Sequence, residues 1–295
     1  MKLLYTKKIM ILHAHLPQAE LLSIILGFLL RKKVIVSKHN AEPFASKLGK
    51  KISLILARFV NRNASDIVFI SEAAKKFAVM NEEVVQNDFS KMHVIHYGMP
   101  LDLQETVVPR KRNLECLQNE VLRIGTLSRL ESQKDLSTLI QACVILKKRG
   151  VKALCEIYGR GSLEKELRKE IVELGLENFV LLQGFTHDKF DVLARLDLFV
   201  LSSKYEGFGL VLLEAMAARV PIVSSNSDAA IEVLGSNSPC LFESGDALSL
   251  SNKIIEIGSN ISLQNAIVNN YKERLQMFSA DTMFRQMMNL YQNDN

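Results

Sequence analysis

Short apolar runs rich in β-branched residues alternate along the chain with longer segments whose apolar positions repeat at helical spacing. The runs with the length and composition of strands are 8–12, 33–37, 66–70, 92–96, 121–127, 153–158, 179–183, 198–201, 221–224 and 239–242. The segments with helical spacing include 134–149, 163–174 and 210–218. Strands that alternate with helices predict parallel sheets with helices on both faces, and continuous apolar runs fit strands buried on both sides. The pattern therefore predicts an α/β protein.

A polar stretch at residues 100–120 interrupts this alternation, and we interpret it as an interdomain linker. It predicts a first Rossmann-like domain at 1–113 and a second at 114–278, with parallel sheets that face a cleft. In residues 279–295, apolar side chains recur at helical spacing and need a partner surface; they are Met283, Phe284, Met287, Met288 and Tyr291. We expect this C-terminal helix to pack back on the first domain.

Composition narrows the class and the compartment of the protein. The 295 residues are 48% apolar, which is enough for one or two buried cores. The cysteines form no Cys-x-x-Cys pair, so we expect reduced thiols in a cytoplasmic protein; they are Cys116, Cys143, Cys155 and Cys240. The apolar runs at 8–12 and 21–30 are too short to span a bilayer.

The positive charge is concentrated at the N-terminal end. The formal net charge is +5, and residues 1–62 hold twelve lysines and arginines against only Glu20 and Glu42. A basic end on a body that is not basic indicates an anionic partner at that end. The alternative is a solvated basic surface that serves solubility.

Residues 202–216 combine the end of a strand, a glycine-containing turn and the start of a helix near Gly209. Glycines let a ligand approach the backbone closely, and the free N–H groups and dipole of a helix N-terminus suit a phosphate. Glu206 lies in the turn, and Glu214 lies about one and a half turns inside the helix. A carboxylate can accept hydrogen bonds from both hydroxyls of a ribose diol. The alternative is an ordinary helix start, where a glutamate favours the dipole.

A second polar stretch, residues 125–135, follows another strand and places Arg129 and Lys134 in a loop before a helix. Two cations at the carboxyl end of a strand can neutralise a diphosphate. They would stabilise the charge that develops when a nucleoside diphosphate leaves. The alternative is a pair of solvated surface cations.

Together, these two stretches resemble the retaining glycosyltransferases of the GT-B type, and family 4 in particular. Glu206 and Glu214 match the Glu-x7-Glu signature, and Arg129 and Lys134 match the arginine and lysine pair of that family. Further segments with family-like sequence follow in order: 12–15, 37–40, 69–73, 94–98, 158–161, 182–185, 220–223 and 230–233. The resemblance runs from about residue 13 to the C-terminus.

The resemblance implies a role for each matching position. It implies catalytic roles for Glu206, Arg129, Lys134 and His39, donor-binding roles for Glu214, Gly207, Phe208, Gly209, Leu210, Val211, Gly159 and Phe185, and an acceptor-side position for His15. Glu206 would contact hydroxyls of the donor sugar, and Glu214 would hold the ribose. The two cations would hold the diphosphate, and the backbone N–H groups of 208–211 would meet sugar and phosphate.

The remaining implied contacts come from both domains. His39 would approach the donor sugar from the first domain, while Gly159 and Phe185 would border the base. His13 and His15 share one face of a strand and could bind a metal, but no third ligand has suitable spacing. We therefore interpret these two histidines as packing or substrate-contact residues.

The reaction implied by the resemblance moves a sugar, with retention, from a nucleotide-diphosphate sugar to a glycan or lipid-linked acceptor. A UDP-sugar is favoured over a GDP-sugar, and no cofactor is implied. The chain has no Asp-x-Asp motif, which argues against a metal-chelated donor. A front-face attack is implied, in which the leaving phosphate assists deprotonation of the acceptor and no protein nucleophile acts.

The chain departs from the family pattern in two places. Arg160 stands where the family commonly has an acidic residue. Family members also carry strands, helices and a glycine-rich loop before the segment that begins here, so we expect an incomplete N-terminal domain. An alternative function is a catalytically incomplete donor-binding subunit, or a truncated remnant, that needs a partner chain. A further alternative is a nucleotide-sugar epimerase, which the joint carboxylate and cation sets disfavour.

Apolar and basic residues share the segment 44–62 at helical spacing. The apolar ones are Phe44, Leu48, Ile52, Ile55 and Phe59, and the basic ones are Lys47, Lys50, Lys51, Arg58 and Arg62. A basic amphipathic helix can lie on an anionic bilayer. The alternative is a domain helix whose apolar stripe packs on the sheet. We expect peripheral association with the inner face of a membrane, which would fit a lipid-carried acceptor.

Other ligand classes lack their motifs. Gly159-x-Gly161 follows a predicted strand, but Glu164 replaces the third glycine of a dinucleotide fingerprint. No phosphate-binding Gly-x4-Gly-Lys motif occurs. The basic end contains no aromatic-interleaved motif, so we expect no nucleic-acid partner.

Overall fold

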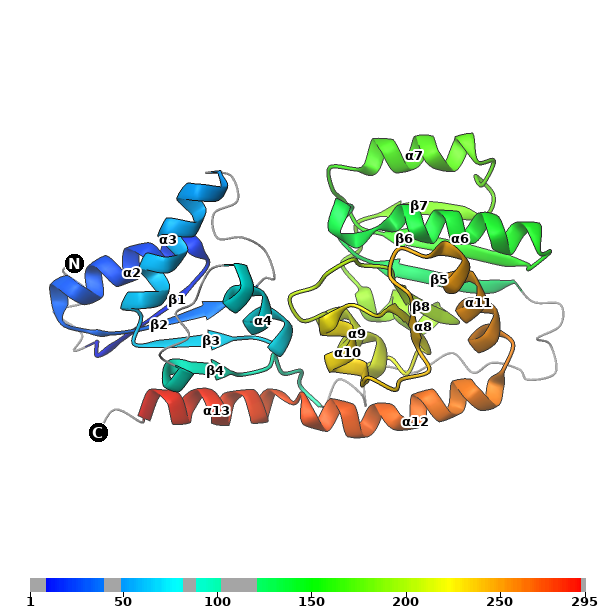
Figure 1. Cartoon of the computed structure of the whole chain (residues 1–295). Coiled ribbons are helices and arrows are strands. Elements are labelled where there is room, and N and C mark those ends of the chain that lie inside the picture. The colour runs from blue at the N-terminus through cyan, green and yellow to red at the C-terminus, as the bar shows by residue number, and fades with distance from the viewer. Residues whose placement is uncertain (1–8, 40–48, 82–88, 102–120, 293–295) are drawn as a thin grey trace. The chain divides into compact units, whose positions relative to one another are not determined.

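The computed structural model describes residues 9–39, 49–81, 89–101 and 121–292 (Figure 1). The chain divides into unit 1, which comprises Met1–Gly98 and Ala280–Asn295, and unit 2, Met99–Ser279. The division between the units thus follows Gly98. The predicted domain boundary at 113–114 lies outside the described residues, as do Cys116, Phe44, Lys47 and Leu48.

Unit 1 is built on a four-stranded parallel sheet in the order β1-β2-β3-β4. Its strands are β1 (Ile11–His15), β2 (Lys33–Lys38), β3 (Asp66–Phe69) and β4 (Met92–Val94). Its helices are α2 (Pro17–Leu30), α3 (Lys50–Asn63), α4 (Glu72–Asn81), the short η2 (Phe89–Lys91) and α13 (Ala280–Gln292). β2 is buried from Val34 to Lys38 and β3 from Ile67 to Phe69, and the apolar part of each strand lies where the sequence pattern predicts it.

The core of unit 1 joins the sheet to the C-terminal helix α13. Ile35, Val68 and Ile95 pack together with Leu290. Three members of the predicted apolar stripe also pack against this cluster, namely Met283, Met287 and Tyr291. Phe284, which we placed in the same stripe, is instead exposed on α13. The buried stripe is therefore rotated toward Leu290, because the i, i+4, i+7 positions from Met283 lie on one face of the helix.

The first strand lies further along the chain than predicted. β1 extends from Ile11 to His15, beyond the predicted run 8–12, and it includes both His13 and His15, which were predicted to lie on one strand. Both histidine side chains find hydrogen-bond partners on neighbouring elements, so polar residues are tolerated at the carboxyl end of this strand.

Unit 2 contains a six-stranded parallel sheet in the order β10-β9-β8-β5-β6-β7. Its strands are β5 (Leu122–Leu127), β6 (Ala153–Tyr158), β7 (Val180–Gly184), β8 (Leu198–Leu201), β9 (Ile222–Ser225) and β10 (Leu241–Phe242). Its helices are η3 (Ser132–Lys134), α6 (Leu136–Lys148), α7 (Glu164–Glu173), α8 (Lys189–Arg195), α9 (Leu210–Ala217), α10 (Asp228–Leu234), α11 (Ala247–Gly258) and α12 (Ile261–Met277).

Helical spacing explains why these segments of unit 2 form helices. In α6 the buried side chains Leu136, Leu139, Ile140, Cys143 and Leu146 follow one face at spacings of three and four residues. In the part of the chain that the structure describes, no helix combines the length and the apolar character needed to cross a bilayer.

The strand order of unit 2 reverses beside β5. From β5 the chain proceeds through β6 to β7 on one side, and it then returns to form β8, β9 and β10 on the other side. β5 and β8 are hydrogen-bonded neighbours, with Ile124 opposite Leu198. Ligands of open parallel sheets bind at such a switch point, beyond the carboxyl ends of the two strands.

Candidate donor site

The switch point of unit 2 brings together the two polar stretches that the sequence singled out. The loop that follows β5 carries Arg129 and leads into η3, which ends at Lys134. The loop that follows β8 carries Glu206 and leads into α9, which contains Glu214. The cation set and the carboxylate set are 72 residues apart at Lys134 and Glu206, yet they meet in one place.

Lys134 and Glu206 form a buried ion pair. Nζ of Lys134 lies 2.6 Å from Oε1 of Glu206, and the side chains are 12% and 9% exposed. Oε1 of Glu206 also accepts a 2.6 Å hydrogen bond from Oγ of Ser203. A buried carboxylate needs such partners, because desolvation of an unpaired charge is costly. The pair fixes the carboxylate and the ammonium group relative to each other at the switch point.

Backbone contacts dock the two loops against each other. Oγ of Ser202 donates to the carbonyl oxygen of Lys134 at 2.8 Å, and N–H of Lys204 donates to the carbonyl oxygen of Gln133 at 2.9 Å. Nζ of Lys204 also lies 3.2 Å from Oδ1 of Asp135. The two loops therefore form one structural element, and the geometry of the ion pair does not depend on side-chain contacts alone.

The N-terminus of α9 has the features of an anion site. Gly209, at the N-cap position, has a φ of 86°, and no side chain caps the helix. That left-handed conformation favours glycine, and it leaves the first N–H groups of the helix for a ligand. The side chain of Phe208 is buried against Phe278, with ring centroids 5.4 Å apart. The predicted contact of Phe208 with the donor would therefore involve its backbone rather than its side chain.

Glu214 is engaged by a lysine that the sequence analysis did not single out. Oε1 of Glu214 lies 2.5 Å from Nζ of Lys189, the first residue of α8. Glu214 is mostly buried and Lys189 is half-exposed. A ribose diol that binds Glu214 would replace or share this contact.

The loop after β6 packs closely on the loop that carries Arg129. A Cβ atom at Gly159 would lie 1.8 Å from the carbonyl oxygen of Ser128, and one at Gly161 would lie 2.3 Å from that of Leu130. The N–H groups of Ser128 and Leu130 donate to the carbonyl oxygens of Tyr158 and Arg160, which continues the pairing of β5 with β6. The two glycines are therefore required by backbone packing, and this packing holds Arg129 at the strand end. A contact of Gly159 with the base remains a prediction.

An exposed aromatic residue follows β7, where the base was predicted to bind. Phe185 lies edge-on to His187, with ring centroids 4.9 Å apart, and its side chain is exposed. An exposed ring at the carboxyl end of a strand offers a flat apolar surface for a nucleobase. Arg160 is likewise exposed, in the loop after β6.

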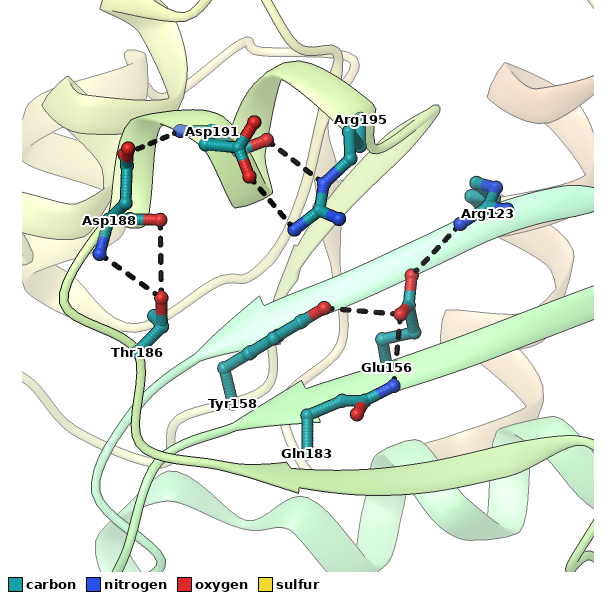
Figure 2. A network of polar contacts seen from close by, with 8 residues as sticks. All are labelled: Arg123, Glu156, Tyr158, Gln183, Thr186, Asp188, Asp191 and Arg195. Atoms are coloured by element: carbon teal, nitrogen blue, oxygen red, sulfur yellow. Dashed lines mark hydrogen bonds and ion pairs between the residues drawn. The ribbon is translucent and has the colours of Figure 1, made fainter.

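A network of polar contacts lies beside this region, between β6, β7 and α8 (Figure 2). Glu156 is buried on β6 and accepts hydrogen bonds of 3.1 Å from the Tyr158 hydroxyl and from Nε2 of Gln183. NH1 of Arg123 lies 3.6 Å from its other carboxylate oxygen. Burial, and then the nearby Glu156 charge, raise the pKa of Tyr158. The network satisfies a buried carboxylate and ties β5, β6 and β7 together.

The same view shows how α8 begins. Oδ1 of Asp188 accepts a 2.9 Å hydrogen bond from the N–H of Asp191, which caps the helix, and Oγ1 of Thr186 accepts from the N–H of Asp188 at 3.2 Å (Figure 2). This cap fixes the first turn of α8 and, with it, the backbone of Lys189.

The other two predicted site residues lie in unit 1. His15 ends β1, His39 follows β2, and Nδ1 of His15 lies 2.8 Å from Nε2 of His39. Nδ1 of His39 is hydrogen-bonded to the Tyr97 hydroxyl. The carboxyl ends of two parallel neighbours thus bring these histidines together, although 24 residues separate them.

Comparison with known proteins decides the family. The model of the glycosyl transferases group 1 matches residues 111–274, which is more than half of the chain. The chain belongs to the group 1 glycosyl transferases. Membership of this glycosyltransferase family, predicted from Glu206, Glu214, Arg129 and Lys134, is confirmed.

Relatives of this group 1 glycosyl transferase match different shares of its length. CapM of Staphylococcus aureus, a capsular polysaccharide biosynthesis glycosyltransferase, is 24% identical over 98% of this chain and 78% of its own. AmsK of Erwinia amylovora, an amylovoran biosynthesis glycosyltransferase, is 34% identical over 49% of this chain and 38% of its own. The match to AmsK therefore spans well under half of that protein.

Solved glycosyltransferases share the fold. HepE of Anabaena, solved in complex with UDP and glucose, has a TM-score of 0.83 and 22% identity, over 99% of this chain and 80% of its own. TarM has a TM-score of 0.75 and 19% identity, over 98% of this chain and 57% of its own. The predicted GT-B fold class, with parallel sheets in both domains, is confirmed.

The group 1 motifs locate the donor-side residues but leave out two partners that the structure adds. Ser203 and Lys189 contact the two signature carboxylates at 2.6 and 2.5 Å. Serine next to a strand end and lysine at a helix start are common on any surface, so neither has a distinguishing pattern in one sequence. Only the fold reveals them, because it brings Lys189, which follows β7, and Ser203, which follows β8, to the two signature carboxylates.

Proposed function

We propose that this group 1 glycosyl transferase moves a sugar from a UDP-sugar, with retention and without a metal, to a glycan or lipid-linked acceptor. The observation that carries the proposal is the meeting of Lys134 with Glu206 at the switch point of unit 2, beside the N-terminus of α9. The name of one relative favours surface polysaccharide as the product class, since CapM is named for capsular polysaccharide biosynthesis. HepE was solved with UDP and with UDP-glucose, which favours uridine in the donor.

The proposed chemistry rests on charge stabilisation. The bond between the sugar anomeric carbon and the β-phosphate oxygen breaks, and the acceptor oxygen bonds to that carbon from the same face. The acceptor proton passes to the leaving phosphate oxygen, so no protein nucleophile is needed. Arg129, Lys134 and the α9 N–H groups would hold the negative charge that develops on UDP. These cations supply the charge that a divalent metal supplies in other transferases.

The carboxylates would orient the donor. Glu206, held by Lys134 and Ser203, would accept hydrogen bonds from hydroxyls of the sugar. Glu214 would accept the ribose hydroxyls in place of Lys189. Phe185 would stack on the base. Orientation by several fixed groups lowers the entropic part of the barrier.

The proposal is tested by donor binding and by the stereochemistry of transfer. We expect calorimetry to give tighter binding of UDP than of GDP. We expect transfer from UDP-glucose to a glycan or lipid-linked acceptor, with NMR showing the α-anomer and with EDTA leaving the rate unchanged. A β-linked product, or loss of transfer in EDTA, would contradict retention or metal independence respectively. Binding of UDP without transfer to any such acceptor would favour a donor-binding subunit that needs a partner chain.

We further propose that the enzyme works in the cytoplasm at the inner face of a membrane, because α3 turns its apolar stripe outward. Ile52, Ile55 and Phe59 are 54%, 64% and 44% exposed, whereas the smaller Ala57 and Ser53 are buried. The other face of α3 is therefore the one that packs on the rest of unit 1. Lys51, Arg58 and Arg62 on the same helix are exposed.

The neighbouring helix α2 extends this apolar surface. Leu22, Ile25, Phe28 and Leu29 are all exposed, with Phe28 86% exposed. The one acidic residue of α2, Glu20, is buried and lies 2.8 Å from Nζ of Lys38. In α2 and α3, exposed apolar residues lie with cations and without an exposed acid, which suits an anionic bilayer surface.

Sedimentation with lipid vesicles tests the membrane proposal. We expect the chain to bind vesicles that contain anionic lipid at low salt and to be released at high salt, since the Debye length is about 10 Å at 0.1 M. Ile55→Gln should weaken binding by about tenfold or more through lost apolar burial. Arg58→Gln should weaken it about fivefold, since a basic residue near the surface contributes about 1 kcal/mol.

A matched control comes from α13, where Phe284 is exposed on another helix of unit 1. Phe284→Gln should leave vesicle binding unchanged. Vesicle binding that changes neither with salt nor with anionic lipid content would contradict the membrane proposal. An equal loss of vesicle binding in Phe284→Gln and Ile55→Gln would contradict it as well.

A further inference from the structure

Three histidines and two tyrosines of unit 1 form a continuous row at the carboxyl ends of β1 and β2. The ring centroids of His13 and His15 are 4.3 Å apart, and those of His15 and His39 are 4.9 Å apart. Tyr291 lies edge-on to His13 at one end, and Tyr97 stacks on His39 at the other. The donor chemistry assigns no role to either tyrosine.

The His13 end of the row is closed by hydrogen bonds. Nδ1 of His13 lies 2.6 Å from the Tyr291 hydroxyl, and Nε2 lies 2.7 Å from Oγ of Ser37. Both ring nitrogens are therefore occupied, and they link β1 to β2 and to α13. This end of the row holds the fold together.

The other end leaves one nitrogen open. Nδ1 of His39 is hydrogen-bonded to the Tyr97 hydroxyl, and Nε2 of His39 lies 2.8 Å from Nδ1 of His15. Nε2 of His15 has no hydrogen-bond partner among the described residues, and the side chain of His15 is exposed. The hydrogen-bonded series Tyr97–His39–His15 thus ends at Nε2 of His15.

The row is uncharged at neutral pH. Burial, and then the neighbouring histidines, lower the pKa of His13 to about 4, and burial and then His15 lower that of His39 to about 4. Burial also lowers the pKa of His15. Burial raises the pKa of Tyr97 and of Tyr291, so both hydroxyls keep their protons. A proton on any one ring would be repelled by the next, which adds to the cost of charging the row.

A buried ion pair includes the residue next to His39 in sequence. Lys38 is the last residue of β2 and directly precedes His39 in sequence. It is buried, and its Nζ lies 2.8 Å from the buried carboxylate of Glu20 on α2. This ion pair carries no net charge.

We propose that Tyr97 is a positioning residue that sets, through His39, the hydrogen-bonding direction of Nε2 of His15, and that this nitrogen contacts a hydroxyl of the acceptor sugar. When the Tyr97 hydroxyl donates a hydrogen bond to Nδ1 of His39, the ring proton of His39 lies on Nε2. This Nε2–H group then donates a hydrogen bond to Nδ1 of His15. The His15 proton is then on Nε2, directed outward as a donor. This inference rests on the proposed transferase function and assigns the acceptor-side chemistry within it.

The chemistry of the open nitrogen selects the ligand class. A neutral imidazole N–H suits the lone pairs of a sugar hydroxyl, whereas an imidazolium would favour an anion. Because five of the six ring nitrogens in the row are already occupied, His39 contributes by fixing the tautomer of His15 rather than by a second ring contact of its own.

NMR of the full chain labelled with 15N-histidine tests the relay without requiring activity. In the wild type, we expect His39 and His15 as Nε2–H tautomers. Tyr97→Phe keeps the ring and removes the hydroxyl that stabilises the neutral form, so it should raise the pKa of His39 from about 4 and mix the tautomers of His39 and His15. Resonances are assigned with His15→Gln and His39→Gln.

Tyr291→Phe is the matched control, because it removes the hydroxyl at the other end of the row. It should raise the pKa of His13 and leave the tautomer of His15 unchanged. Mixed tautomers of His15 in the wild type, or a Tyr97→Phe chain whose His15 and His39 signals do not change, would overturn the relay.

Steady-state kinetics then tests the acceptor contact. Tyr97→Phe should raise KM for the acceptor about tenfold, with KM for UDP-glucose unchanged, while Tyr291→Phe changes neither. An equal rise in both constants would overturn the acceptor role of His15. If the wild type transfers no sugar although the NMR results hold, the transferase proposal fails and the relay stands.

Discussion

Replacing Lys134 with alanine is expected to lower the rate of sugar transfer by about a hundredfold or more, because a preorganised charge at the leaving group is lost. The structure adds a second effect. Lys134 is paired at 2.6 Å with Glu206, which is only 9% exposed, so the substitution leaves a buried carboxylate without its cation. Breaking such a pair costs about 3–5 kcal/mol of folding stability. Both effects should appear together in a transfer assay and a denaturant titration.

The Arg129→Ala variant separates the effect on sugar transfer from the effect on folding stability. The side chain of Arg129 is exposed at the same strand end, so Arg129→Ala should lower transfer to a similar extent with little change in unfolding midpoint. Lys148→Ala, an exposed cation at the end of α6, is the matched control and should change neither quantity. A double variant of Arg129 and Lys134 that transfers sugar at the wild-type rate would show that neither cation stabilises the leaving group.

Glu214→Ala is expected to weaken UDP binding by about 1.5–3 kcal/mol, because it removes charge-assisted hydrogen bonds to the ribose. That free energy corresponds to roughly 10- to 150-fold in Kd. Lys189→Ala should weaken binding much less, because the ribose hydroxyls are expected to take over the place that Lys189 holds at 2.5 Å from Glu214.

A thermodynamic cycle that combines the Glu214→Ala substitution with removal of the 2′-hydroxyl, in 2′-deoxy-UDP, isolates the ribose contact. The wild type should bind 2′-deoxy-UDP more weakly than UDP, and Glu214→Ala should bind both with nearly equal affinity. Calorimetry in which the variant still distinguishes the two nucleotides as strongly as the wild type would refute the ribose assignment.

The sequence predicted much of the fold because its signals are local. Leu136, Leu139, Ile140 and Cys143 repeat at helical spacing, and α6 covers most of the predicted segment 134–149. The strand order could not be predicted in this way, since pairing of β5 with β8 joins residues that are far apart in the chain. That order is nevertheless what brings the two polar stretches to one site.

The limits of prediction show most clearly at ion pairs and helix faces. Lys134 and Glu206 were predicted to serve different parts of the donor, and no single-sequence pattern indicates that they pair with each other. On α13, both Phe284 and Leu290 are apolar, but packing on the sheet buries only Leu290. Which apolar residue becomes buried, and which charges pair, depends on segments that are distant in the sequence. Local periodicity carries no information about those segments.

The place of α13 in unit 1 has a consequence for synthesis. Ile35, Val68 and Ile95 emerge from the ribosome early, but their packing partner Leu290 is encoded almost 200 codons after Ile95. Unit 2, Met99–Ser279, contains its own sheet and can close its core before α13 is made. The unit that begins the chain is therefore the last to be completed, and a nascent chain displays an apolar sheet face to chaperones until translation passes Leu290.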